Sequence, residues 1–206
     1  MSHSHRRRQP RQPVDYNPDM DGPATYEDLL ALPEDEKAEI IAGEIVVQPA
    51  GLPEHGRSQG WLWSRVGGAY DDDDGRGGPG GWWILQETDV RFRPNEIVRP
   101  DLAGWLRERL PSPWGLRPID VVPDWTCEIL SPSNRSLDLV TKRELYARHG
   151  VRHYWIVDPE NATLEALELV DGGWCRVGHH GRDDCVRVPP FEEVELELSR
   201  LFLAAG

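Results

Sequence analysis

Apolar and polar positions in the N-terminal part of the chain predict a short helix followed by a hairpin. Thr25 and Asp28 form a capping-box pattern, which opens a helix that ends at Pro33. A second short turn is expected over residues 34–38. β-Branched residues flank an Ala-Gly pair within residues 39–48, and this pattern is typical of two strands joined by a tight turn.

A longer helix is predicted to begin at Pro53. Leu62, Val66 and Tyr70 are spaced so that they would bury one face of this helix. The chain then enters an acidic, glycine-rich stretch over residues 71–81, which indicates a solvated loop. Neighbouring aspartates in a flexible loop do not converge on one ion, so we expect no metal site there.

The rest of the chain alternates strand-like and helix-like segments. They are, in order, strands over residues 82–93, 97–106 and 125–130, a helix over 136–149, a strand over 153–158, a meander over 163–190 and a short helix over 198–203. A bend is expected near Glu87, and Gly150 supplies the stop signal of the helix. The predicted fold class is therefore α/β or α+β: a mixed sheet flanked by helices, with an N-terminal helix-hairpin extension and a C-terminal β-meander.

Composition places the chain among ordinary globular proteins. Its 206 residues include 20 Gly, 18 Pro, 38% hydrophobic and 29% charged residues, which excludes collagens, coiled coils and disulfide miniproteins. We expect a disordered basic tail over residues 1–23 and a single domain over residues 24–206. There is no apolar run of the roughly 20 residues that span a bilayer, and no secretory signal at the N-terminus. Three cysteines without framework spacing favour a reducing compartment, so a cytoplasmic location and no membrane partner are expected.

Charge argues against a simple nucleic-acid-binding surface. The net charge is −13, and residues 1–13 carry four arginines and no acid. Residues 14–206 therefore hold 19 basic and 36 acidic side chains, a net charge of −17. A polyanion would approach this body against a repulsive field unless divalent cations, a local basic face or the arginine tail reverse the sign at the contact.

Two acids in apolar strands are the strongest candidates for chemistry. Asp101 follows Pro100 at the start of one predicted strand, and Glu128 lies between Cys127 and Ile129 in another. Alternation places Glu128 on the face opposite its two apolar neighbours, where burial is costly unless the carboxylate is paired or bound to a cation. Two such carboxylates on adjacent strands would make an oxygen site for Mg²⁺ or Mn²⁺.

Lys142 is a further candidate, because lysine is rare in this chain. There are 21 arginines but only two lysines, Lys37 and Lys142. An ammonium group is a compact point charge that can orient water or neutralise a phosphate, and the planar guanidinium of arginine replaces it poorly. The other interpretation is an exposed i, i+4 pair with Asp138, which would stabilise the helix only slightly.

Several segments together resemble a known family. They are TYEDLLALPEDEKAEIIAGEIVVQP, RPDLA and CEILSPSNRSLDLVTKRELYARHGVRHYWIVDPE, followed by the terminal meander. These segments resemble the Uma-two family of endonuclease-like proteins, within the PD-(D/E)XK superfamily, over nearly all of residues 25–203. The resemblance implies a restriction-endonuclease-like core, usually dimeric, in which Asp101 is the motif aspartate and Glu128 the motif acid.

The chain departs from the superfamily pattern at the motif lysine. Leu130 occupies the position two residues after Glu128 where a lysine is usual. By resemblance, the D-x-x-x-K-x-x-x-Y helix of Asp138, Lys142 and Tyr146 supplies the replacement. This assignment requires that the helix direct Lys142 toward the two acids.

The activity implied by the resemblance is metal-assisted hydrolysis of DNA. Asp101, Glu128 and the carbonyl oxygen of Ile129 would hold the Mg²⁺ or Mn²⁺ ion, and Lys142 would position the attacking water or the developing charge. A second interpretation is a catalytically inactive, dimeric interaction module that retains the nuclease fold, which accounts more easily for the acidic body. A third is a metal-dependent hydrolase of smaller phosphate esters.

Supporting residues are predicted around this set. Glu39 and Glu44 flank the early hairpin, and one of them could reach the metal, although exposed hairpin carboxylates are the favoured interpretation. His55 could lie beside the scissile phosphate or could be a surface or capping residue. Glu87, on the first central strand, is a possible additional metal ligand.

Two other sets of residues are candidates for binding phosphate or zinc. Candidates for a basic groove are Arg57, Arg65, Arg91, Arg93, Arg99 and Arg135. Zinc-type ligands occur in Cys175, His179, His180 and Cys185, but their spacing matches no usual zinc site, and an exposed hairpin is the favoured interpretation.

Overall fold

The larger sheet forms the centre of the molecule. The computed structural model describes residues 22–33, 36–49, 51–71 and 78–202. In sheet order, the strands are β10 (Gly173–Gly181), β9 (Thr163–Val170), β8 (His153–Asp158), β7 (Trp125–Ile129), β6 (Leu102–Leu106) and β3 (Trp82–Gln86). β7 and β8 are parallel, whereas the other neighbours are antiparallel. The sheet is therefore mixed, as the order of the predicted elements indicated.

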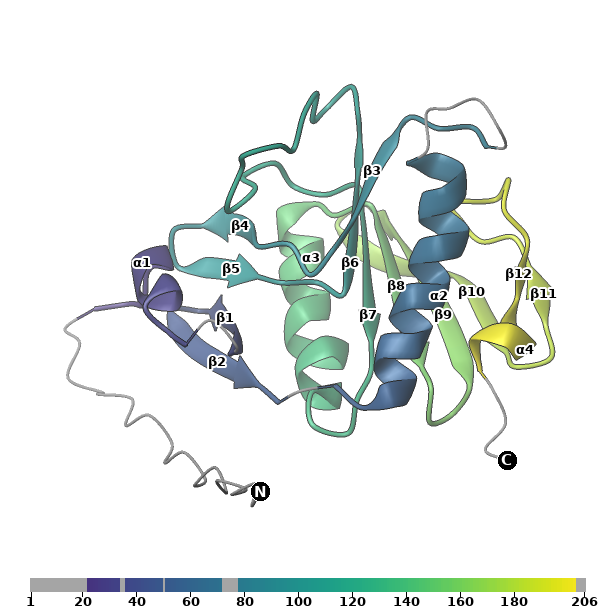
Figure 1. Ribbon diagram of the computed structural model, residues 1–206, viewed down its shortest axis with the longest axis horizontal. Coiled ribbons are helices and arrows are strands. Elements are labelled where there is room, and N and C mark those ends of the chain that lie inside the picture. The colour runs from purple at the N-terminus through teal and green to yellow at the C-terminus, as the bar shows by residue number, and fades with distance from the viewer. Residues whose placement is uncertain (1–21, 34–35, 50, 72–77, 203–206) are drawn as a thin grey trace, which may run out of the picture.

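A smaller sheet lies beside this centre (Figure 1). Its strands are, in sheet order, β2 (Glu44–Gln48), β1 (Lys37–Ile41), β5 (Glu96–Val98) and β4 (Val90–Arg93). The short helix α1 (Tyr26–Leu30) packs on β1, and β11 (Cys185–Val186) pairs with β12 (Leu196–Glu197) in a third, two-stranded sheet. The smaller sheet thus brings the N-terminal hairpin to the central part of the chain.

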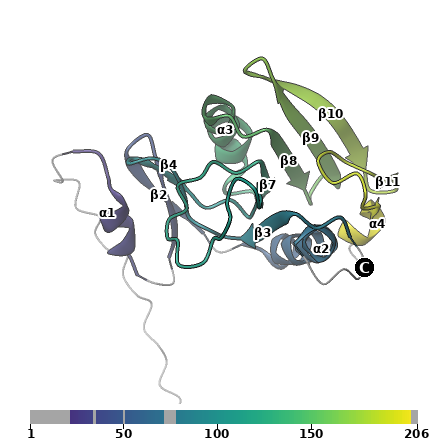
Figure 2. The same cartoon turned by 90° about the horizontal axis from the view of Figure 1, so that it is seen from above.

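Helices cover the two faces of the larger sheet, as seen from above in Figure 2. The helix α2 (Pro53–Tyr70) and the short C-terminal helix α4 (Leu198–Leu201) pack on one face, and α3 (Arg143–His149) packs on the other. Cys127 and Ile129 of β7 belong to the core under α2, so the intervening Glu128 faces α3. This confirms the alternation that the sequence predicted for β7.

The predicted hairpin is present and has a two-residue turn. Ile41 pairs with Glu44, and Ala42 and Gly43 both have positive φ, 53° and 83°. This backbone matches the right-handed twist of the two strands, and glycine adopts it without steric cost. The second turn that we predicted over residues 34–38 is wrong at its end, because β1 already begins at Lys37; residues 34 and 35 lie outside the described part of the chain.

Two of the predicted long strands are each divided between the two sheets. The segment 82–93 becomes β3 and β4, with Glu87 at a positive φ of 44° between them. The segment 97–106 becomes β5 and β6, with Pro100, which lacks a backbone N–H, at the junction. Each of these two segments thus crosses from one sheet to the other, and Glu87 and Asp101 lie at the two crossings.

The predicted helix over residues 136–149 is present but begins with a wider turn. The π-helix η1 (Leu137–Lys142) leads directly into α3, which ends at Gly150 in the left-handed conformation. The terminal helix ends at Leu201, two residues before the predicted end. Residue 203, residues 1–21 of the tail predicted over 1–23, and residues 72–77 of the acidic loop lie outside the described residues. In the described ranges no helix has the length and apolar character needed to cross a membrane.

Candidate active site

Asp101 and Glu128 lie at neighbouring positions of two adjacent segments, Asp101 directly before β6 and Glu128 in β7. Leu102 of β6 pairs with Cys127 of β7 in antiparallel register, so Asp101 and Glu128 occupy the next pair of positions. Both side chains are buried, with 2% and 1% exposure for the two residues. Such burial of two acids is costly unless each carboxylate has compensating partners.

Lys142 is the main partner of Glu128. Its Nζ lies 3.1 Å from Oε1 of Glu128, 3.0 Å from Oε1 of Glu39 and 3.3 Å from Oδ1 of Asp138. The hydroxyl of Tyr146 also donates a hydrogen bond to Oε1 of Glu128, at 2.5 Å. The helix therefore directs Lys142 to Glu128, one of the two acids that the assignment named, and the catalytic role of Lys142 stays a prediction.

The η1–α3 helix presents three polar side chains on its buried face. Asp138, Lys142 and Tyr146 are successive i, i+4 neighbours, and all three are buried. The interpretation of Asp138 and Lys142 as an exposed i, i+4 pair is thus wrong, because this face of the helix packs against β7 and β1. Oδ2 of Asp138 has no hydrogen-bond partner among the described residues, which leaves a buried polar atom available.

Glu39, and not Glu44, is the hairpin acid that reaches this cluster. Its side chain is fully buried, and it accepts hydrogen bonds from the backbone N–H of Arg99 at 2.7 Å and from Nε2 of Gln48 at 2.5 Å. The favoured interpretation of an exposed carboxylate is wrong for Glu39, because β1 is an interior strand of the smaller sheet. Glu44 lies on the outer strand β2 and is exposed.

Asp101 has a separate set of partners. Its Oδ2 accepts a hydrogen bond from the N–H of Ile129 at 2.8 Å and lies 3.1 Å from Nε2 of His55. Its Oδ1 lies 3.1 Å from Nζ of Lys37. Burial alone would raise the pKa of Asp101, but the His55 contact, the Lys37 charge and the Ile129 N–H together lower it to about 2. Asp101 is therefore a carboxylate at neutral pH.

Lys37 also belongs to the site, although the sequence pattern did not predict this. Its ammonium group joins Asp101 to Glu87, whose Oε1 lies 3.4 Å away. The two lysines of the chain therefore end at the two motif acids, Lys37 at Asp101 and Lys142 at Glu128. The rarity that marked Lys142 applied equally to Lys37, so this signal could have identified both.

His55 is a buried residue and not a surface histidine. It lies in the first turn of α2, it is 7% exposed, and its ring reaches Asp101. A Cβ atom at Gly51 would lie 3.1 Å from Nδ1 of His55, so the backbone of Gly51 packs closely on the ring. On the same helix, Nε2 of Gln59 donates to the carbonyl oxygen of Asp101 at 2.9 Å. The helix α2 thus fixes both the side chain and the backbone of Asp101.

Glu87 lies at the edge of the site. Its side chain is 45% exposed, and it approaches the site only through Lys37 and Nε2 of Gln59, at 3.4 Å each. Its role as a metal ligand stays a prediction.

Negative charge exceeds positive charge in the buried cluster. Burial raises the pKa of Glu128 well above its usual range; Lys142 opposes this shift, and Asp138, Asp101 and Glu39 add to it. The pKa of Asp138 is raised to about 6. Burial is the largest cause, Lys142 opposes the shift, and the charges of Glu39 and Asp101 add to it. A bound cation would relieve both effects.

The donor set fits a metal ion that keeps water or substrate ligands. Among the described residues, no three Asp, Glu, His or Cys side chains are placed to hold an ion by themselves. Asp101 and Glu128 supply two carboxylates, and the carbonyl of Ile129 faces β6, as its N–H does. Mg²⁺ is commonly bound by one or two carboxylates together with waters and substrate phosphates. The residues present therefore fit such an ion.

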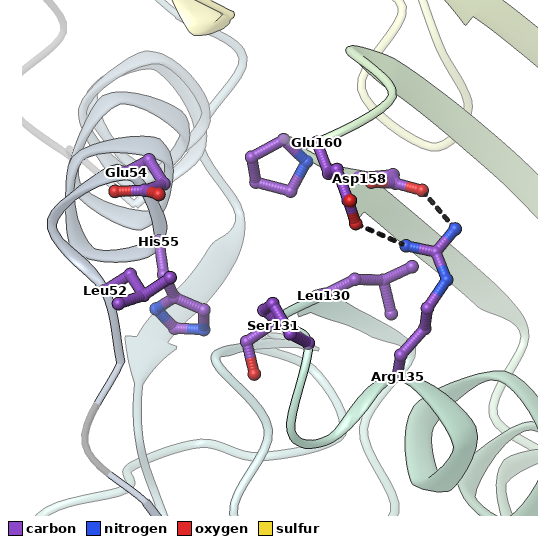
Figure 3. Close-up of a pocket in the computed structure, with 10 residues that line it drawn as sticks. Leu52, Glu54, His55, Leu130, Ser131, Arg135, Asp158 and Glu160 are labelled. Carbon is purple, nitrogen blue, oxygen red and sulfur yellow. Dashed lines mark hydrogen bonds and ion pairs between the residues drawn. The ribbon is translucent and has the colours of Figure 1, made fainter.

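The predicted basic groove is not free for phosphate, because most of its arginines are paired. Arg91 pairs with Asp120, Arg93 with Glu96, Arg99 with Asp89 and Arg135 with Asp158, and Arg57 donates to the carbonyl of Leu201. Arg65 is exposed on α2. The close-up in Figure 3 shows the guanidinium of Arg135 directed at Asp158 and Glu160.

The cysteine and histidine residues weighed for zinc belong to different sheets. Cys175, His179 and His180 lie on β10, whereas Cys185 lies on β11, and both cysteines are exposed and free. This agrees with the exposed-hairpin interpretation.

The fold and the sequence are both similar to those of known nuclease-like proteins. The fold is similar to the crystal structure of a protein from Anabaena variabilis described as a "putative nuclease belonging to DUF820", with 23% identity, a TM-score of 0.68, and coverage of 87% of this chain and 98% of that chain. The molecule therefore has a nuclease-like fold. The family model Uma2, described as "Putative restriction endonuclease", matches residues 23–200, so the chain belongs to the Uma2 family and the predicted resemblance is confirmed. Comparison with curated proteins gives no match.

Proposed function

We propose that this protein is a divalent-metal-dependent endonuclease that hydrolyses DNA phosphodiester bonds. The observation that carries the proposal is the placement of two buried acids at neighbouring positions, Asp101 directly before β6 and Glu128 in the adjacent β7, with Nζ of Lys142 3.1 Å from Glu128. Membership in a family described as restriction endonucleases supports DNA as the substrate class.

Asp101, Glu128 and the carbonyl oxygen of Ile129 would hold the Mg²⁺ or Mn²⁺ ion. When bound, such an ion lowers the pKa of a coordinated water and stabilises negative charge on the phosphate. Asp101 suits this role because its pKa of about 2 keeps it ionised, and His55 and the N–H of Ile129 fix its orientation. The carboxylate is thus ready to bind a cation without first losing a proton.

Lys142 acts as a fixed positive charge and not as a base. Burial alone would lower its pKa, but Glu128, Glu39 and Asp138 raise it well above its usual range. The ammonium group therefore keeps its proton at neutral pH and can donate hydrogen bonds to the attacking water or to the charge that develops on the phosphate. Glu39 and Asp138 hold it in place.

A titration and a cleavage assay on the same samples test this proposal. Mn²⁺ and Mg²⁺ are titrated calorimetrically into the wild type, Asp101→Asn, Glu128→Gln and, as a control, the exposed-acid variant Glu44→Gln. We expect saturable binding and plasmid nicking in the wild type and Glu44→Gln, and neither in the two site variants. Thermal unfolding of each variant shows whether a loss reflects the site or the fold. Equal nicking by the wild type and a folded Asp101→Asn would contradict the assignment.

A second function is a dimeric, non-enzymatic interaction module. The observations that favour it are the net charge of −13 and the pairing of most groove arginines with acids, both of which disfavour contact with DNA. Under this proposal the wild type binds neither cation and does not nick DNA, and the acids serve the fold. The titration above therefore separates the two proposals.

A further inference from the structure

A cavity of about 260 Å³ lies beside the candidate active site. It opens between the first turn of α2 and the segments that follow the parallel strands β7 and β8 (Figure 3). The residues that carry the argument are Leu52, His55, Leu130, Arg135, Asp158 and Glu160. Ligand sites in mixed sheets favour this position, at the carboxyl ends of parallel strands.

His55 connects the cavity to the catalytic acids. The histidine lines the cavity, and its Nε2 lies 3.1 Å from Oδ2 of Asp101. A group bound in the cavity is therefore separated from the carboxylate of Asp101 by one side chain. If a phosphodiester is cleaved at Asp101, the cavity is within reach of a nucleotide that adjoins the cleaved bond.

The charges around the cavity disfavour a phosphate. Three carboxylates line it, from Glu54, Asp158 and Glu160, and Arg135 supplies one guanidinium that is already bound to two of them, at 2.6 Å from Asp158 and 3.8 Å from Glu160. An anion would meet excess negative charge there. A neutral group rich in N–H donors would instead find acceptors.

The remaining walls suit a flat, partly apolar group. Leu52, Leu130, Pro132 and Pro159 present apolar surface. The volume of about 260 Å³ is just below the range of roughly 300–1,000 Å³ that is typical of pockets for drug-sized ligands, so the cavity has room for a single ring system.

We propose that this cavity is a subsite for one unstacked nucleobase that carries an exocyclic amino group, as adenine, cytosine and guanine do. The inference rests on the proposed nuclease function and adds the substrate feature that the site selects. Glu160 accepts from the amino group, as carboxylates accept from N4 of cytosine, and Arg135 donates to the adjacent ring nitrogen or carbonyl. Thymine has no amino group and gains less from the acidic wall.

Nucleoside binding without divalent cations tests the subsite apart from cleavage. The probes are deoxycytidine, deoxyadenosine and thymidine, observed by saturation-transfer NMR. We expect the wild type to bind the two amino-bearing nucleosides with a Kd on the order of 1 mM and thymidine at least about fivefold more weakly. Leu52→Trp, at a residue 48% exposed, should fill the cavity and abolish binding, whereas Leu116→Trp, at a residue 46% exposed elsewhere, should preserve it.

A second variant tests the acidic wall. Glu160→Ala removes the acceptor of a side chain that is 73% exposed, so the fold should tolerate the change, and the preference over thymidine should be lost. Absence of nucleoside binding, equal binding of thymidine by the wild type, or unchanged binding in Leu52→Trp would each overturn the subsite. Nucleoside binding without nicking of any DNA would support the subsite and contradict the nuclease proposal. Nicking without nucleoside binding would support the nuclease proposal and contradict the subsite.

Discussion

Lys142 and its carboxylates form a buried ionic network in which the lysine is the shared member. The Lys142 residue is 1% exposed, and it lies within 3.3 Å of Glu39, Glu128 and Asp138. Removing one partner of a buried pair leaves the other charge uncompensated, which costs more than the pair itself contributes. Removal of Lys142 should therefore lower the free energy of unfolding much more than removal of any one of its acids.

We predict that Lys142→Met lowers the free energy of unfolding by about 3–5 kcal/mol, because three buried carboxylates lose their common cation. Glu128→Gln should change it by less than about 1 kcal/mol, because the amide oxygen can still accept from Lys142 and Tyr146, and Glu39 and Asp138 still pair with the lysine. Urea unfolding followed by circular dichroism measures both values. Equal losses in the two variants would show that the network does not depend on the lysine.

Among single residues, the sequence singled out Asp101, Glu128 and Lys142 as the centre of the candidate site. Glu128 stood out because an acid inside an apolar strand needs a partner, and Lys142 stood out because lysine is rare in the chain. The sequence pattern assigned no role to Lys37 and favoured an exposed position for Glu39, because both residues reach the site only through long-range packing of the hairpin. Local pattern carries no information about where a separate sheet docks.

At the scale of elements, the β1–β2 hairpin delivers Lys37 and Glu39 to the acids, and its turn fixes their register. A one-residue slip in the pairing would turn both side chains to the opposite face. Gly43 is critical in this turn, because it has a φ of 83° and because a Cβ atom there would lie 2.8 Å from Cβ of Pro23.

Gly43→Ala is therefore predicted to lower the free energy of unfolding by about 1–3 kcal/mol, since a side chain is strained at this backbone conformation. The matched control is Gly60→Ala in the helix α2, where nothing lies within 4 Å of the added Cβ atom. This control should gain roughly 0.5–1 kcal/mol, because alanine loses less entropy than glycine in a helix. Chemical denaturation of both variants gives the comparison, and a stabilised Gly43→Ala would contradict the strained turn.

Elements were predicted more reliably than their assignment to sheets. Period-two patterns identified the segments 82–93 and 97–106 as strands, but each divides between two sheets at Glu87 and at Pro100. The π-helical turn over Leu137–Lys142 has i→i+5 hydrogen bonds and spans only six residues, which is too short for apolar periodicity to distinguish it from an α-helical turn. The existence of a strand is a local property, whereas its partner depends on the whole fold.

At the scale of the whole molecule, charge limits how DNA could be bound. Beyond residues 1–13 the chain carries a net charge of −17, and most arginines of the predicted groove are engaged with acids. Among the described residues, the arginines of this groove are therefore largely unavailable to displace the counterions of DNA. The homodimer stays a prediction, which sedimentation velocity can check.

We predict a weak salt dependence of DNA binding. Each neutralised phosphate contributes a slope of about −0.9 to the plot of log K against log salt, so two or three contacts give about −2 to −3. Fluorescence anisotropy with Glu128→Gln, which should bind without cleaving, measures the slope between low and moderate salt. A slope steeper than about −5 would instead indicate an extended basic face.

The placement of the two lysines also has a consequence for protein chemistry. In a chain with 21 arginines, amine-selective acylating reagents can react with only two side chains, Lys37 beside Asp101 and Lys142 beside Glu128. The side chain of Lys142 is 1% exposed, whereas that of Lys37 is 21% exposed. Apart from the α-amino group, a single acylation would therefore label the entrance to Asp101, and a fluorophore attached there would report directly on what occupies the site.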